Sequence, residues 1–141
     1  MAIHEAAHAV LYCRYGRDFQ RVSIAPMSAV WVARGSDGVM HSSQLPVLLE
    51  LQARMAGEVA MFLGRIGVSG GDRDEAGEIA PRETGGDQVE AALLLEQAWS
   101  DARSLLESSR TWRQVERVAA ALQHVRTVDG DDVRKLCSLA D

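Results

Sequence analysis

Two histidines and a glutamate near the start of the chain have the types and the spacing of a metal-dependent hydrolytic site. The segment His4-Glu5-Ala6-Ala7-His8 fits the pattern HExxH, and the apolar residues around it, with no Pro and no Gly before Gly16, predict a helix. Side chains four residues apart lie one above the other on a helix, so His4 and His8 can present imidazole nitrogens to one metal ion. Glu5 is rotated by about 100° from His4 and about 60° from His8. Its carboxylate is therefore expected beside the metal, where a general base acts on water.

An HExxH pattern also occurs by chance on solvated helices, and two features of this chain argue against that alternative. Both x positions are alanine and the flanking residues are apolar, which predicts a largely buried helix. Buried ionisable groups require a partner or a metal. We therefore expect Zn²⁺ as the cofactor, with His4 and His8 as ligands and Glu5 as the catalytic base.

The composition describes one globular domain, residues 1–141, and excludes several classes of function. An apolar fraction of 47% and a charged fraction of 25% are those of a folded globular protein. The net charge is −5 with acids and bases interspersed, so no basic face indicates nucleic acid. No apolar run approaches the roughly 18 residues that span a bilayer. Cys13 and Cys137 are far apart and form no CxxC motif, which favours reduced thiols and a cytoplasmic location.

The periodicity of apolar residues predicts an α+β fold that is mostly α. A helix is expected from the start of the chain to about Gly16, then short strands at 22–25, 30–33 and 39–41. Helices are expected over 43–66 and 87–107, separated by a glycine-rich connection at 67–86. Thr111 to Gln114 has the form of a capping box, and Val128-Asp129 that of a staple and N-cap before the last helix. We expect the HExxH helix to pack on a small mixed three-stranded sheet (residues 1–41), followed by a long central helix and a C-terminal helical bundle (43–141).

With these elements in order, the chain resembles the peptidase domain of the FtsH-type ATP-dependent zinc metalloproteases. The resemblance is carried by segments that are similar to that family's HEAGHA helix, VSIIP strand, LGGRAA central helix and TGASND helix start. In this chain they are His4–Val10, Val22–Pro26, Met55–Ala60 and Thr84–Asp87, and Val128–Val133 is similar to the start of the family's last helix.

The resemblance implies a third zinc ligand at Asp87. In the family the aspartate that opens the later helix binds zinc with the two motif histidines, and a catalytic zinc does keep three protein ligands and one open position. The alternative role of Asp87 is that of a helix N-cap, which aspartate often performs. Glu83 and Glu90 are the other acidic candidates, whereas His41 and His124 lack a supporting pattern.

The resemblance further implies an endopeptidase that hydrolyses peptides or unfolded proteins through a metal-activated water. The chain has no GxxxxGK[ST] loop, so it corresponds to the proteolytic part alone and a separate ATPase partner is expected to supply substrate. The family assembles as a ring, which implies a homo-oligomer. An edge strand, at 22–25 or 30–33, is expected to hold extended substrate. The alternatives are a non-catalytic interaction or assembly module of the same fold, and a regulatory metalloprotease of the ImmA/IrrE sort that cuts one partner.

Overall fold

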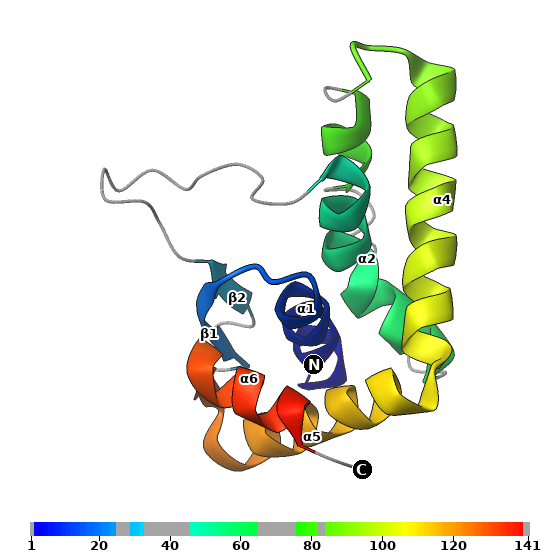
Figure 1. Ribbon diagram of the computed structural model, residues 1–141. Helices are drawn as coiled ribbons and strands as arrows, with labels where there is room; N and C mark the ends of the chain where they lie inside the picture. Colours follow the sequence, from blue (N-terminus) through cyan, green and yellow to red (C-terminus); the bar gives the residue numbers. More distant parts are fainter. Residues whose placement is uncertain (1, 25–28, 33–45, 65–75, 82–83, 140–141) are drawn as a thin grey trace, which may run out of the picture.

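The computed structural model describes residues 2–24, 29–32, 46–64, 76–81 and 84–139, which form helices and a small antiparallel sheet at one side of them (Figure 1). The predicted class, α+β and mostly α, is confirmed. The elements in chain order are α1 (Ala2–Arg14), β1 (Phe19–Ser23), β2 (Ala29–Val32), α2 (Val47–Leu63), α4 (Gln88–Glu107), α5 (Ser109–Val125), β3 (Thr127–Asp129) and α6 (Gly130–Ser138). Residues 76–81 are also helical. In the described ranges no helix is long and apolar enough to cross a membrane.

Helix α1 occupies the middle of the fold and contacts α2, α5, α6 and the sheet (Figure 1). Most of its buried apolar residues are small or aliphatic, and Ala6, Ala7 and Ala9 are fully buried. Alanine lets the neighbouring helices approach closely, because no side chain beyond Cβ separates the backbones. The helix ends where predicted, since Gly16 takes a positive φ of 75° that favours glycine.

The sheet has the strand order β2-β1-β3, and both pairings are antiparallel. The third strand differs from the prediction: it is formed by 127–129, and the expected strand at 39–41 lies outside the described residues. Val128 is buried and pairs with Val22, so the segment expected to act as a helix staple is a strand instead. Asp129 still precedes α6, but its side chain makes no cap hydrogen bond. The expectation of a mixed sheet is wrong for these strands.

Helix α2 lies between α1 and α4 and matches the predicted central helix where the structure describes it. Pro46 lies just before its first turn, which suits a residue without an N–H group. The connection predicted at 67–86 contains the helical segment 76–81. Ala76 and Ala80, four residues apart, are buried in the same apolar cluster as Leu51 and Met55 of α2. The sequence does not predict this helix, because the glycines around it are typical of a loop.

Helix α5 begins at Ser109, two residues before the predicted capping box. Thr111 and Gln114 both lie inside the helix and are buried, so they cannot cap its start. Gln114 donates a hydrogen bond to the Cys137 carbonyl at 2.7 Å instead. Arg126 closes α5 in the left-handed conformation, with φ 69°. The capping-box prediction is therefore wrong, because both residues lie beyond the helix start and Gln114 bonds to α6 instead.

Candidate functional site

The structure brings His4 and His8 together on α1. Their Nε2 atoms are 3.2 Å apart and their ring centroids 4.9 Å apart. His4 is only 7% exposed, whereas His8 is partly exposed and opens the pair to solvent. The spacing follows from the four-residue step of the helix, as the sequence predicts.

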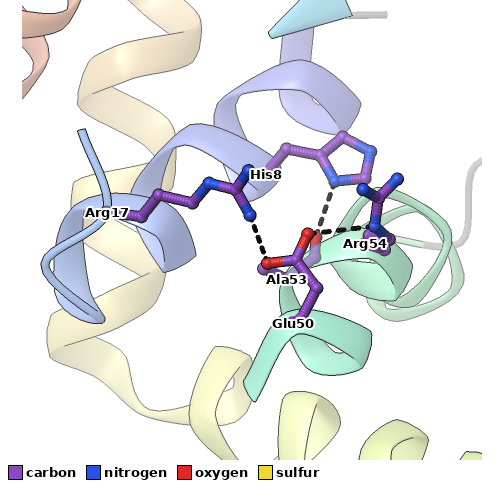
Figure 2. Close-up of polar contacts among 5 residues, drawn as sticks. All are labelled: His8, Arg17, Glu50, Ala53 and Arg54. Atoms are coloured by element: carbon purple, nitrogen blue, oxygen red, sulfur yellow. Dashed lines mark hydrogen bonds and ion pairs between the residues drawn. The ribbon is translucent and has the colours of Figure 1, made fainter. Parts of the chain in front are cut away.

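A backbone carbonyl of α2 determines which nitrogen of the His8 ring carries a hydrogen (Figure 2). The Nδ1 atom of His8 lies 2.7 Å from the Ala53 carbonyl oxygen. A carbonyl oxygen can only accept, so Nδ1 must donate its hydrogen. In the neutral ring the lone pair is then on Nε2, which faces His4. Histidines that bind metals almost always donate their second nitrogen in this way.

The spacing of the two Nε2 atoms fits the geometry of two ligands of one zinc ion. Zinc–nitrogen bonds of about 2.0–2.1 Å at a tetrahedral angle place the two nitrogens about 3.3 Å apart. The observed 3.2 Å agrees with that value. The donor chemistry also agrees, since neutral imidazole nitrogen is a preferred zinc ligand.

Glu5 lies beside this pair and is buried. Its Oε1 atom is 4.0 Å from His4 Nε2, and the residue is 5% exposed. The first turn of α1 therefore carries a carboxylate next to the imidazole pair, in the place that the HExxH spacing predicts for a base. Its neighbours Ala6 and Ala7 are fully buried, which limits solvent around the carboxylate.

A buried ion-pair network holds α2 against the segment that follows α1. The Glu50 carboxylate pairs with Arg17 and, at 3.0 Å, with Arg54 (Figure 2). The Arg17 side chain is 2% exposed, and its Nε has no hydrogen-bond partner among the described residues. Glu50 is three residues before Ala53, so this network fixes the turn of α2 that orients His8. The Glu50–Arg54 spacing is readable in the sequence, but nothing in the sequence singles out Arg17.

A second polar chain links the end of α1 to α2 and α4. The Tyr15 hydroxyl donates to Gln52 Oε1, and Gln52 Nε2 donates to Asp101 at 3.1 Å. Gln97 donates to the other oxygen of Asp101 at 2.7 Å. Burial, above all, raises the pKa of Tyr15 to about 12, so its hydroxyl stays a donor at neutral pH. This chain sets the position of α2 relative to both neighbouring helices.

Asp87 is not brought to the histidines. It is exposed at the start of α4, where its Oδ1 accepts a hydrogen bond from the Glu90 N–H at 3.0 Å. Figure 1 shows the first turn of α4 at the end of that helix farther from α1. Glu90 is exposed on the same turn, and Glu83 lies outside the described residues. Asp87 therefore has the N-cap role here, since its carboxylate satisfies a backbone donor that the helix leaves unpaired.

Within the described part of the chain, no three His, Cys, Asp or Glu side chains are grouped so that they could hold a metal. His4 and His8 are the two ligand-type nitrogens that meet, with Glu5 beside them. Of the other histidines, His124 lies near the end of α5 and His41 lies outside the described residues.

Comparison with known proteins adds no assignment to this site. The sequence matches no family model, and it matches no curated protein.

Proposed function

We propose that the chain is a zinc-dependent endopeptidase that hydrolyses peptide bonds in peptides or unfolded proteins. One observation carries this proposal: two imidazole Nε2 atoms 3.2 Å apart, with a buried carboxylate 4.0 Å from one of them. The hydrogen bond from His8 Nδ1 to Ala53 supports it, because that bond leaves the Nε2 lone pair for a metal.

His4 and His8 would hold Zn²⁺, and Asp87 is the proposed third ligand. When bound, zinc supplies a Lewis acid that polarises a carbonyl and lowers the pKa of water to about 7. Binding through Asp87 requires its carboxylate to leave the N-cap position and the start of α4 to move toward α1. We therefore propose that ligand as a separate, testable part of the site.

Glu5 acts as the general base and then as the general acid. Its carboxylate takes a proton from the attacking water and delivers it to the departing amine. The buried position favours this role, since a carboxylate shielded from bulk solvent keeps the proton within the site. A positioned acid–base group of this kind contributes about 10²–10⁴-fold to a rate.

The sheet provides a strand for an extended substrate. β1 is paired on both sides, with β2 and β3, so it offers no free edge to a substrate. β2 pairs with β1 alone among the described strands, and we propose that its other edge receives the substrate by strand addition. A separate ATPase would supply unfolded chains, and the protein would act as a homo-oligomer.

The substitution Glu5→Gln tests the chemistry. We expect this variant to retain zinc and to lose cleavage of an unfolded casein or a fluorogenic peptide by at least about 10²-fold. The matched control is Glu96→Gln, an exposed glutamate of α4, which should leave both zinc and cleavage unchanged. Cleavage by Glu5→Gln at the wild-type rate would remove Glu5 from the mechanism.

A second candidate is a non-catalytic module that uses the same fold for interaction or assembly. The capping role of Asp87 favours it, because a site with two protein ligands is incomplete for catalysis. The substitution Asp87→Ser separates the two functions, since serine keeps an N-cap but removes the carboxylate. A tenfold or greater loss of zinc affinity supports the peptidase, and unchanged zinc without turnover supports the module.

A further inference from the structure

Two cysteines far apart in the sequence meet where α1 packs on α6. Cys13 lies in the last turn of α1 and Cys137 in the last turn of α6. Both are free, and both are half-buried. They line one cavity of about 240 Å³ together with Arg14, Gln114 and Arg134.

Hydrogen bonding between the two thiols contributes to both of their pKa values, and the two values are shifted in opposite directions. The bond from Cys137 and the charge of Arg134 lower the pKa of Cys13 to about 7, against an opposing effect of burial. The same bond, followed by burial, raises the pKa of Cys137. Cys13 is thus the thiol that ionises first as pH rises, with a pKa near neutral, while Cys137 keeps its proton.

The charges around the pair favour an anion on Cys13. Arg14 and Arg134 line the cavity, and the charge of Arg134 lowers the pKa of Cys13. Arg134 is itself paired with Asp131 and, at 3.3 Å, with Asp18, so its guanidinium is held in place beside the cavity. A partly exposed thiolate beside a fixed cation is the usual setting of a reactive cysteine.

We propose that Cys13 and Cys137 are a redox-active dithiol that glutathione disulfide oxidises to an intramolecular disulfide between α1 and α6. The site lies one and a half turns beyond His8 on the helix, and the proposal does not depend on metal binding or peptidase activity. Both side chains line one cavity between two packed helices, so a disulfide between them would join α1 to α6.

The exchange balances in two steps. The Cys13 thiolate attacks one sulfur of glutathione disulfide, which forms a mixed disulfide and releases one glutathione thiolate. Cys137 then loses its proton to solvent and attacks the Cys13 sulfur of that mixed disulfide. The second glutathione leaves as a thiolate, so two electrons pass from the protein dithiol to glutathione disulfide. Reduced glutathione reverses both steps.

The test is oxidation of the reduced full chain by glutathione disulfide at pH 7, followed by acid quench, alkylation and intact-mass measurement. We expect both thiols to disappear together, with a mass lower by two hydrogen atoms and no glutathione retained. Peptide mapping should join Cys13 to Cys137. Persistence of two alkylatable thiols, or of a stable glutathione adduct on the wild type, would overturn the proposal.

Two single variants assign the roles. Cys137→Ser should stop at one glutathione on Cys13, because no second thiol resolves the mixed disulfide. Cys13→Ser should react roughly tenfold more slowly than wild type, because the remaining thiol lacks the depressed pKa. Equal rates for the two variants would show that the pair has no attacking and resolving member, and would contradict the assignment.

Discussion

At His8, the direction of a single backbone carbonyl decides what the ring can do. The Ala53 oxygen takes the Nδ1 hydrogen, so Nε2 presents a lone pair toward His4. The identity and spacing of the histidines are evident in the sequence, because the four-residue step of a helix alone places them together. The carbonyl that orients one of them is not evident, since every residue carries one and only packing selects it.

At the same scale, Cys13 should show an unusual pH profile. Because its pKa is lowered from 9.0 to about 7, its alkylation by iodoacetamide should reach half of its maximal rate near pH 7. The folded pKa lies below the unfolded one, so this thiol favours the native state increasingly as pH rises from 7 to 9. The raised pKa of Cys137 has the opposite sign and withdraws stability above pH 9.

The substitution Arg134→Gln is the matched test of that profile. Removing the guanidinium should move the half-maximal pH upward, because Arg134 lowers the Cys13 pKa. Arg113→Gln, on α5 outside the cavity, is the control and should not move it. A wild-type midpoint near 9 would contradict the contact between the two thiols.

At the scale of elements, α6 starts directly against the backbone of β1. A Cβ atom on Gly130 would overlap the Phe19 carbonyl oxygen. We therefore expect Gly130→Ala to destabilise the protein by about 1–3 kcal/mol, since a strand and a helix must separate to admit a methyl group. Urea unfolding followed by circular dichroism measures this change.

Gly77→Ala provides the control for Gly130→Ala. Gly77 is helical, and a Cβ there meets no atom of the described residues within 4 Å. Alanine should stabilise that segment by about 0.5–1 kcal/mol, because it restricts the unfolded chain and favours the helix. Equal effects of the two substitutions would show that α6 does not approach β1 as described.

The buried Glu50–Arg17 pair should contribute more to the free energy of unfolding than an exposed ion pair, because it joins α2 to the segment after α1. Glu50→Gln leaves the Arg17 cation buried without its carboxylate, and we expect a loss of about 3–5 kcal/mol. Glu107→Gln breaks the exposed Arg103–Glu107 pair and should change stability by less than about 0.5 kcal/mol. If Glu50→Gln also weakens zinc binding while the fold persists, the network positions Ala53 against His8. Unchanged stability in Glu50→Gln would contradict the buried pair.

The sequence predicts well those elements whose signal lies within their own residues. The periodicity of apolar residues finds α1, α2 and α4, because one helix face carries that signal within a few turns. β3 is missed, since three residues become a strand only by pairing with β1, whose partner Val22 is about a hundred positions away. Thr111 is misassigned for a similar reason: its surroundings, not its local sequence, bury it inside α5.

At the scale of the whole molecule, α1 joins the histidine pair, the sheet and the cysteine pair. His4 and Glu5 lie near its start and Cys13 near its end. The helices α2, α5 and α6 and the strands β1 and β2 all contact it. The resemblance that suggested Asp87 concerns the order of segments, whereas ligation depends on where α4 begins in space. The distance from the start of α4 to the histidines is set by the packing of α2 against α4. That packing cannot be read from the order of segments in the sequence.

Zinc binding should therefore be measurable as stability of the entire chain. A ligand that binds only the native state at about 100 times its Kd stabilises it by about 2.7 kcal/mol. For a chain of 141 residues this corresponds to a rise in Tm of roughly 5–10 °C. We expect that rise with zinc and not with magnesium, because magnesium prefers oxygen ligands to imidazole.

Substitutions at the histidines and at Cys137 show which residues bind the zinc that raises Tm. His4→Ala and His8→Ala should abolish the zinc-dependent rise in Tm, whereas Cys137→Ser should retain it, since the thiols lie at the other end of α1. A rise that survives in His8→Ala but disappears in Cys137→Ser would assign the metal to the dithiol. In that event the HExxH residues would have no metal to activate water, and the peptidase proposal would fail while the contact between α1 and α6 would stand.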